Sequence, residues 1–154
     1  MGIEIERKYL VRSDEWKSLG EKEYYQQGYL LINRSCTIRV RIVNNIGFLT
    51  IKGDSVGISR NEFEYRIPYN DAKSMLVNLC EKPFIEKFRT KIEMNNVVWE
   101  VDEFLGENEG LVIAEVELLN EEQKIDLPDW IAEEVTGNPM YYNSNLVKHP
   151  YKKW

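Results

Sequence analysis

The sequence contains few cysteines and histidines, the residues that most often form soft metal sites and nucleophilic centres. Cys36 and Cys80 are its two cysteines among 154 residues, and His149 is its single histidine. Two cysteines without C-x-x-C spacing cannot form a disulfide framework, so we expect ordinary reduced side chains. His149 has no partner at metal-ligand spacing, and we expect it to be structural or solvated.

Long apolar runs and an excess of positive charge are missing as well. No stretch approaches membrane-spanning length, and two acids among the first six residues argue against a signal peptide, so we expect a soluble, cytoplasmic protein. The net charge of −6 argues against a protein that coats nucleic acid or an anionic membrane. The chain has 154 residues, of which 43% are hydrophobic. This length suits one domain over residues 1–154 and is too short for two.

Segments with a period of two recur along the chain and are separated by short stretches rich in Gly, Asn, Asp or Pro. This pattern predicts antiparallel strands. We expect eight of them, near residues 3–11, 24–32, 37–43, 47–53, 61–67, 86–92, 97–104 and 111–118. Asn44-Asn45 and Asn95-Asn96 are expected to form hairpin turns, because Asn tolerates positive φ.

Three other segments have helical spacing. Residues 71–80 repeat an apolar residue at each turn and begin with Asp71, whose charge complements the helix dipole. A second helix is expected after Pro128, and a third from Pro139 to about Lys148. No repeat or flexible linker interrupts the chain, so we expect no domain boundary.

Most of the expected strands carry charges on one face and apolar residues on the other, because alternate side chains leave opposite faces of a strand. The acids on these faces are Glu4, Glu6, Glu62, Glu64, Glu100, Asp102, Glu115 and Glu117. The bases are Lys8, Arg39, Arg41, Lys52, Lys87 and Arg89. Many of these charges form like-charged pairs on one strand, and such pairs repel each other unless something binds between them.

Two arrangements explain such charged faces, and the residues alone leave both open. An open sheet would expose the charges to solvent. A closed barrel, which eight strands commonly form, would turn them into a lumen. Buried charges need partners, so a lumen with both signs implies a ligand that is anionic and metal-bearing, such as a polyphosphate. Because all candidate metal ligands are oxygens, Mg²⁺ or Mn²⁺ is favoured over Zn²⁺.

The series of motifs, beginning with Glu4-x-Glu6-x-Lys8, resembles the CYTH group of the triphosphate tunnel metalloenzymes, whose signature is ExExK. Later motifs follow in the order of that family: Arg39-x-Arg41, Lys52, Glu62-x-Glu64, Lys87-x-Arg89, Glu100 with Asp102, and Glu115-x-Glu117. The resemblance implies an α+β, mainly β fold. Its centre would be an eight-stranded antiparallel closed β-barrel, a tunnel with a charged lumen, with helices packed outside and the final helix near one mouth.

The resemblance also implies a role for each charged residue. The ligands of Mg²⁺ or Mn²⁺ would be Glu4, Glu6, Glu115 and Glu117. The phosphate-binding groups would be Arg39, Arg41, Lys52, Lys87 and Arg89. Lys8 would lie beside the reacting group, while Glu62 and Glu64 could bind metal, orient the attacking water or hold the arginines. Glu100 and Asp102 would orient the bases.

The implied activity is metal-dependent hydrolysis of inorganic triphosphate to pyrophosphate and phosphate, with nucleoside triphosphates as poorer substrates. Its partner would be this small molecule, with no nucleic acid or membrane. Adenylyl cyclase or thiamine triphosphatase activity, polyphosphate or nucleotide binding without catalysis, and assembly as a homodimer stay open. Phe63, Tyr65, Phe88 and Trp99 alternate out of phase with the charges, so we expect them outside the barrel and no stacking pocket for a base inside it.

Overall fold

A computed structural model describes residues 2–154 of the chain. The strands are β1 Gly2–Val11, β2 Lys22–Ile32, β3 Cys36–Val43, β4 Ile46–Val56, β5 Ser59–Ile67, β6 Ile85–Met94, β7 Val97–Phe104, β8 Val112–Glu117 and β9 Ile131–Glu134. The α-helices are α1 Tyr69–Asn78 and α2 Asn143–Lys148. Short 3-10 turns cover Glu15–Ser18, Gly106–Asn108, Pro139–Tyr141 and Tyr151–Lys153.

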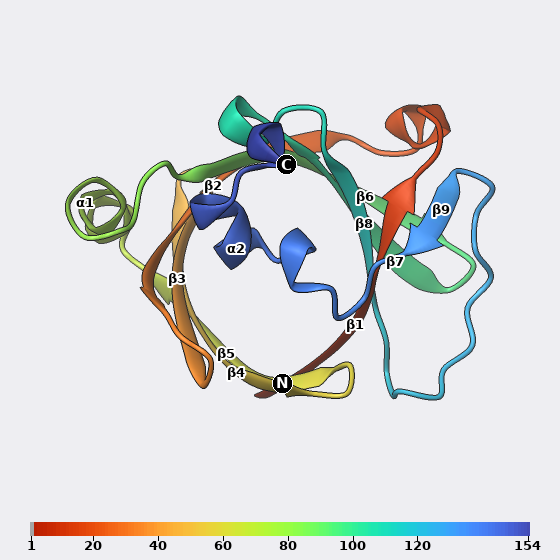
Figure 1. The fold of residues 1–154 in the computed structure, drawn as a ribbon, viewed down its shortest axis with the longest axis horizontal. Helices are drawn as coiled ribbons and strands as arrows, with labels where there is room; N and C mark the ends of the chain where they lie inside the picture. Colours follow the sequence, from red (N-terminus) through yellow and green to blue (C-terminus); the bar gives the residue numbers. More distant parts are fainter. Residues whose placement is uncertain (1) are drawn as a thin grey trace.

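The first eight strands close into a barrel. They lie in the order β5-β4-β3-β2-β6-β7-β8-β1, and β1 pairs again with β5. Each of these pairings is antiparallel. The view down the barrel axis in Figure 1 shows the strands as a ring. The prediction of a closed, mainly β barrel is therefore confirmed, and the open sheet is wrong.

The two Asn-Asn turns form as the sequence predicts. Asn44 and Asn45 have φ angles of 51° and 60°, and Asn95 and Asn96 have φ angles of 52° and 65°. In each case the flanking residues pair across the turn, so the loop has two residues. Positive φ at both central positions gives these turns the twist that antiparallel strands need.

Strand β1 is shared by three partners, and this corrects one prediction. Residues 2–5 pair with β5, and residues 6–10 pair with β8. Beyond the end of β5, on the same edge of β1, Tyr9 and Val11 pair with β9. The helix expected after Pro128 is therefore wrong: the segment forms a strand because its backbone satisfies polar groups of β1 that would otherwise have no strand partner. Trp130 and Ile131, the start of the supposed helical stripe, are buried on this side.

Helix α1 packs on the outside of the barrel and begins two residues earlier than expected, directly after Pro68. Its buried residues are Ala72 and Leu76, which contact β2, β3 and β4. Gly47 allows this close approach, since a Cβ there would lie 2.6 Å from Cβ of Ala72. The helix therefore covers part of the apolar outer face of the strands.

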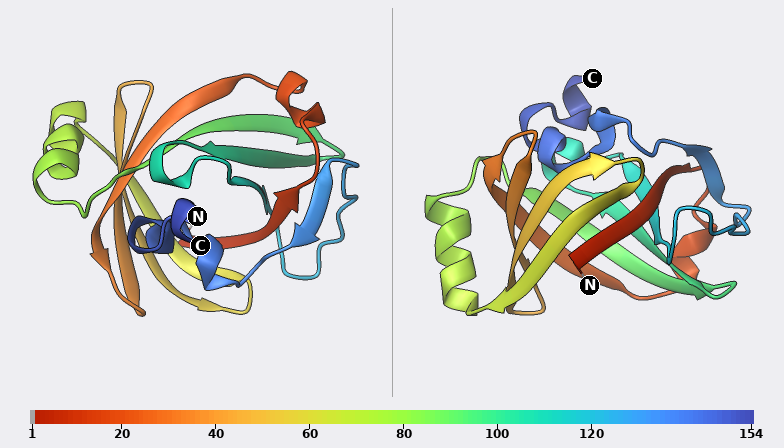
Figure 2. Two further views of the ribbon diagram at one scale, coloured as in Figure 1. Left: turned by 45° about the horizontal axis from the view of Figure 1, so that its top comes forward. Right: turned by 90° about the horizontal axis from the view of Figure 1, so that it is seen from below.

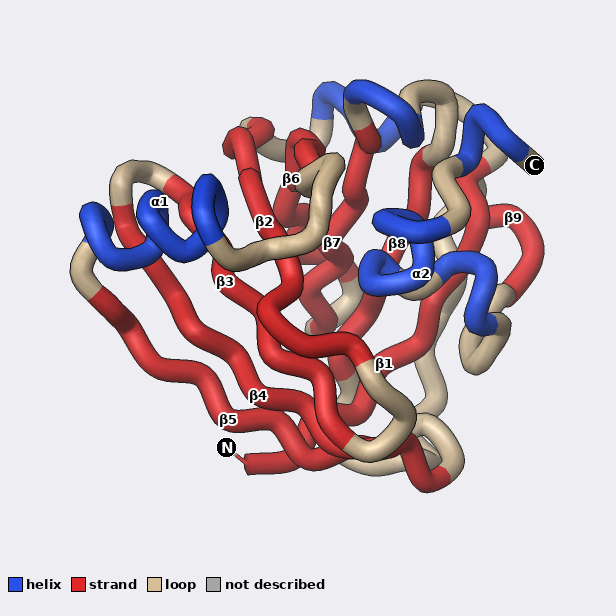
Figure 3. Tube along the Cα trace, turned by 60° about the vertical axis from the view of Figure 1, so that its left-hand side comes forward, coloured by secondary structure: helices blue, strands red, loops and turns tan. Residues whose placement is uncertain are grey.

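The expected third helix is interrupted at Tyr142, whose ψ of 132° separates a 3-10 turn from α2. Unlike α1, α2 does not lie outside the barrel. Figure 1 shows it within the outline of the ring, and Figures 2 and 3 show the C-terminal segment gathered at one end of the barrel. Leu146 and Val147 are buried there against residues of β2, β6, β7 and β8. The expectation that all helices pack outside is wrong for α2, while its expected place near one mouth is confirmed.

The apolar faces of the strands form the core outside the lumen. One cluster joins Tyr9, Trp16, Trp99 and Trp130, and the Trp99 ring lies edge-on to the other two rings of Tyr9 and Trp130. Trp99 is fully buried there, as expected of an outward-facing residue. None of the helices in residues 2–154 is long and apolar enough to cross a lipid bilayer.

Candidate functional site: a charged tunnel

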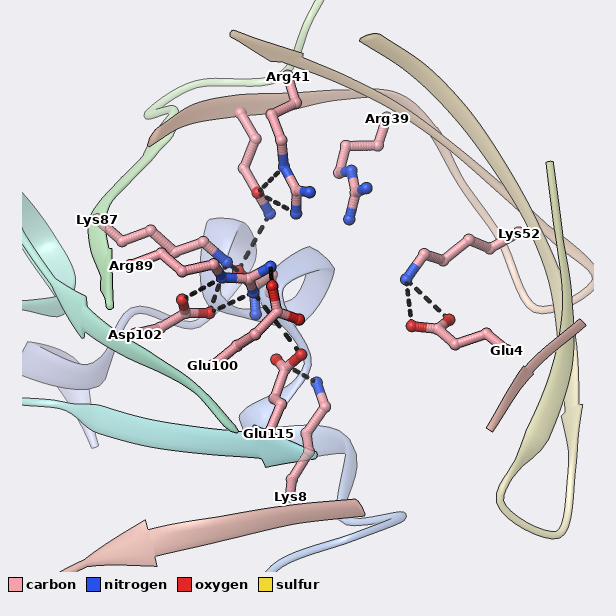
Figure 4. Close-up of polar contacts among 12 residues, drawn as sticks. Glu4, Lys8, Arg39, Arg41, Lys52, Lys87, Arg89, Glu100, Asp102 and Glu115 are labelled. Carbon is pink, nitrogen blue, oxygen red and sulfur yellow. Dashed lines mark hydrogen bonds and ion pairs between the residues drawn. The ribbon is translucent and has the colours of Figure 1, made fainter. Parts of the chain in front are cut away.

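The barrel encloses a cavity of about 590 Å³ that opens to solvent. All the charged residues singled out from the sequence line it, except Asp102. They reach it because period-two alternation puts one face of each strand inside the closed barrel. In Figure 4, side chains from strands all around the barrel point toward one central space.

Asp102 lies directly behind the cavity wall and is completely buried. Its carboxylate accepts hydrogen bonds from Nζ of Lys87 at 2.8 Å and from Nε and Nη2 of Arg89 at 2.7 and 2.8 Å. Glu100 adds a contact to Nη1 of Arg89 at 3.2 Å. Burial opposes ionisation of Asp102, but Arg89 and Lys87 outweigh it and lower its pKa. One anion therefore fixes two cations of the cavity wall (Figure 4).

Lys87 is less well compensated than Arg89, because the two share Asp102. Burial lowers the pKa of Lys87 to about 7, Arg89 and Arg41 act in the same direction, and Asp102 and Glu115 oppose them. For Arg89 the same burial is outweighed by Asp102 and Glu100, which raise its pKa well above the usual value. A bound anion near Lys87 would restore its charge.

Arg39 and Arg41 extend from β3 into the same space (Figure 4). Nη2 of Arg39 lies 3.4 Å from Glu64 and 3.1 Å from the Thr50 hydroxyl, which donates to Glu64 at 2.8 Å. Arg41 has no carboxylate within 4.0 Å in the described part of the chain. Its guanidinium and that of Arg89 both lie over the Tyr25 ring, 5.0 and 5.2 Å from its centre. Guanidinium groups thus converge in one region, which suits a phosphate.

Two lysines hold carboxylates of the first and eighth strands. Nζ of Lys52 lies 3.0 Å from Glu4, and Nζ of Lys8 lies 3.6 Å from Glu115. Burial opposes ionisation of both glutamates, but Lys52 lowers the pKa of Glu4, and Lys8 with Arg89 lowers that of Glu115. Both acids are therefore ionised and paired with cations.

Other acids of this wall have neighbours of the same sign. Glu6 and Glu117 lie directly opposite each other on β1 and β8. Burial, then the charges of Glu115 and Glu4, raises the pKa of Glu6 well above its usual value. Burial also raises the pKa of Glu62 to about 7, where Lys52 lowers it and Glu4 raises it. Adjacent carboxylates with raised pKa values are a donor set that a hard divalent cation would stabilise.

The oxygen atoms of these carboxylates suit a divalent cation, but the side chains are not arranged around a common point. Within residues 2–154, no three Asp, Glu, His or Cys side chains form a group that could hold a metal ion as they stand. Glu4 and Glu115 are paired with Lys52 and Lys8 instead. Glu4 already lies beside the carboxyl groups of Glu6 and Glu62, so metal binding would mainly require the two lysines to release Glu4 and Glu115.

Neutral residues of the lumen were missed by sequence reasoning, which followed charge alone. Tyr25, Tyr29, Phe48 and Tyr142 line the cavity, so the lumen contains aromatic rings as well as charges. Two of these rings already contact cations: Tyr25 as described, and Tyr142 with Nζ of Lys8 at 5.4 Å. Two of them could have been found from the sequence of β2, because Tyr25 and Tyr29 lie on the same face of that strand and are buried.

Two basic residues of the lumen were also missed. Arg60 and Lys91 line the cavity. Lys91 continues the alternation of Lys87 and Arg89 along β6, so period two alone would have found it. Arg60 similarly precedes Glu62 and Glu64 on β5, and its Nε is buried without a hydrogen-bond partner among the described residues.

A closed antiparallel barrel whose lumen is lined by interleaved acids and bases places this chain among the tunnel-shaped β-barrel proteins. The comparison with protein families makes the assignment specific. The chain belongs to the CYTH domain family, whose model matches residues 2–151. The family predicted from the motif series is therefore confirmed.

Similar proteins cover nearly the whole chain. An inorganic triphosphatase from Acetivibrio thermocellus is 55% identical over 154 residues, which is 100% of this chain and 99% of that protein. An inorganic triphosphatase from Nitrosomonas europaea is 34% identical over 148 residues, or 94% of this chain and 96% of that protein. A crystal structure of an inorganic triphosphatase has a TM-score of 0.66 and 32% identity, covering 94% of this chain and 93% of that one.

Proposed function

We propose that this protein hydrolyses inorganic triphosphate to pyrophosphate and phosphate with the help of Mg²⁺ or Mn²⁺. The observation that carries the proposal is the enclosed cavity into which cationic groups converge from several strands of the barrel. The relatives named as inorganic triphosphatases, one of them 55% identical along the full chain, support the same activity.

The phosphate groups would be bound by Arg39, Arg41, Lys52, Lys87 and Arg89. Arg39 and Arg89 are each held by carboxylates, which fixes the direction of their guanidinium groups. Glu100 and Asp102 would serve this orientation and not touch the substrate. Phosphoryl transfer depends mainly on positioning and charge neutralisation, and such fixed cations supply both.

The divalent cation would be held by Glu4, Glu6, Glu115 and Glu117. Their oxygens suit Mg²⁺ or Mn²⁺, and such an ion would offset the repulsion of Glu6 by the charges of Glu115 and Glu4. When bound, the ion would neutralise phosphate charge and lower the pKa of coordinated water. Lys8, released from Glu115, would then be free to contact the reacting phosphoryl group.

Glu62 and Glu64 differ in what they can do. Glu64 accepts from Thr50 and lies beside Arg39, so it would hold that arginine. Glu62 has a pKa of about 7 and lines the cavity beside Glu4 and Lys52. It would accept a proton from the attacking water. No serine, cysteine or histidine is required as a nucleophile.

The proposal is tested by incubating the protein with triphosphate, ATP or thiamine triphosphate and Mg²⁺ or Mn²⁺, and identifying the products. We expect release of phosphate from triphosphate, none in EDTA, and almost none from a Glu115→Gln variant that retains its fold. Cyclic AMP from ATP would indicate a cyclase, and faster hydrolysis of thiamine triphosphate a thiamine triphosphatase. Tight binding without turnover would indicate a binding module. Full activity in EDTA would contradict the metal.

Substrate preference is a second test. Recognition would centre on the phosphates, and the Tyr25 and Tyr142 rings already contact cations. Catalysis responds to interactions that strengthen in the transition state, which here lie at the phosphoryl groups. We therefore expect a higher kcat/KM for triphosphate than for ATP, with GTP and CTP close to ATP. A marked preference for ATP over all three would contradict this.

A further inference from the structure

Arg41 differs from the other predicted bases in how it is held. In residues 2–154, each of Lys8, Arg39, Lys52, Lys87 and Arg89 has a carboxylate within 4.0 Å. Arg41 instead donates from Nε and Nη2 to a neutral amide oxygen, Oε1 of Gln27, at 3.1 and 3.0 Å. Gln27 lies directly opposite Arg41 on the neighbouring strand β2.

Gln27 is itself fixed from the other side. It is completely buried, and its Nε2 donates to Oδ1 of Asn143 at 3.1 Å and lies 3.2 Å from the Tyr29 hydroxyl. Oδ1 of Asn143 also accepts from Nζ of Lys87 at 2.8 Å. These contacts determine which end of the Gln27 amide faces Arg41, because the NH₂ end is committed to Asn143.

A neutral anchor and a charged anchor have different consequences. A carboxylate orients a guanidinium but cancels most of its field, whereas an amide oxygen orients it with two hydrogen bonds and leaves the charge uncompensated. The environment of Arg41 agrees: burial, then Arg39 and Arg89, lowers its pKa to about 10. An anion placed beside Arg41 would stabilise its charged form and raise its pKa again.

We propose that Gln27 is a positioning residue of the tunnel, whose neutral amide fixes the Arg41 guanidinium while leaving its charge available to a phosphate group of the substrate. The inference rests on the proposed function and deepens it, since it assigns to Arg41 the strongest attraction for the incoming anion. Asn143 is the second link, through which the start of α2 keeps the amide in its orientation.

The test compares two near-isosteric variants. Gln27→Glu keeps an acceptor for Arg41 but neutralises its charge, and Gln27→Met removes the anchor but keeps the charge. We expect Gln27→Glu to raise the Kd for sodium triphosphate, measured by calorimetry in EDTA, at least about tenfold. Gln27→Met should raise Kd less and lower kcat with Mg²⁺ about tenfold, because Arg41 is no longer oriented.

The order of the two effects separates positioning from a merely structural role. If Gln27 only supported the fold, Gln27→Met, which loses every hydrogen bond, would be the more damaging variant for Kd as well. Gln26→Glu is the matched control, since it adds the same charge one residue away on the other face of β2, where the side chain is half-buried. Its Kd should stay within about twofold of the original.

Several outcomes would overturn the inference. A Kd for Gln27→Glu that is within about twofold of the original, or below that of Gln27→Met, would do so. If Gln27→Glu does not fold, an unchanged kcat in Gln27→Met would be sufficient to overturn the inference. Binding of triphosphate by the unmodified protein, without release of phosphate after Mg²⁺ or Mn²⁺ is added, would contradict the proposed function alone, because the Kd comparison needs no turnover. Absence of binding in EDTA would contradict the inference alone, and absence of binding with either metal as well would contradict both.

Discussion

Replacing Asp102 by Asn tests the electrostatic arrangement of the cavity wall most directly. The substitution preserves shape and removes one charge from a group with no solvent exposure. It leaves Lys87 and Arg89 without the carboxylate that accepts three hydrogen bonds from them. Breaking a buried ion pair by removing one partner costs about 3–5 kcal/mol. For a domain of this length, each kcal/mol lowers Tm by about 2–4 °C, so we expect a loss of about 6–20 °C.

The same substitution should also alter binding. The pKa of Lys87 is already lowered to about 7 and would fall further without Asp102. Lys87 would then be neutral at pH 7.0, and the Kd for triphosphate should rise. A saturating concentration of triphosphate should recover part of the lost Tm, because its charge replaces that of Asp102.

Thermal unfolding followed by circular dichroism measures this effect, with Glu103→Gln as the control. Glu103 is the next residue on β7 and is paired with Lys17 at 3.6 Å near the surface. Surface pairs of this kind contribute about 0–1 kcal/mol, so the control should change Tm by no more than a few degrees. If Asp102→Asn melts within about 2 °C of the control and binds triphosphate normally, Asp102 does not hold the two cations as argued.

Three further predictions concern the acids, the pH and the ligand. Glu6→Gln should raise the Tm of the metal-free protein, because it removes a carboxyl group whose ionisation is opposed by burial and by the charges of Glu115 and Glu4, yet abolish activation by Mg²⁺; a lower Tm would contradict this. The pKa of Lys87 is about 7, so its ammonium group loses its proton as the pH rises through that value. Calorimetry in EDTA should therefore show that triphosphate binds more weakly above this pH, and that binding there is accompanied by proton uptake. Lys87→Met should weaken this dependence, and the part that is left should come from Glu62, whose pKa is also about 7 in the same cavity. Triphosphate with Mg²⁺ at about 100 times Kd should raise Tm by about 5–10 °C, and no shift would argue against binding inside the barrel.

Period-two alternation was sufficient to predict the eight strands and the charged face of most of them, whereas the closed lumen was predicted only with the resemblance of the motif series to the CYTH group. Each strand has one face that can pack against apolar neighbours, and a chain with eight such strands can close without exposing an edge. The Asn-Asn turns were predictable because few residues tolerate positive φ twice in succession. These features depend on local sequence, and the structure agrees with them to within a few residues at most strand ends.

Features that depend on distant partners could not be predicted in this way. Residues 131–134 become a strand only because β1 offers an edge, and their apolar spacing fits a helix equally well. Gln27 and Tyr25 belong to the lumen but carry no charge, so a search for charged faces passed over them. Pairings such as Glu4 with Lys52 join strands far apart in sequence, and no spacing rule contains them.

The sharing of β1 among β5, β8 and β9 also bears on how the protein is made. The first strand is synthesised first, yet its partner residues on β8 lie at 113–117 and those on β9 at 131–134. Until the ribosome has released those segments, one edge of β1 stays unpaired and prone to association with other chains. Closing such long loops favours slow folding. The wall of the binding cavity is therefore incomplete until the eighth strand pairs with the first.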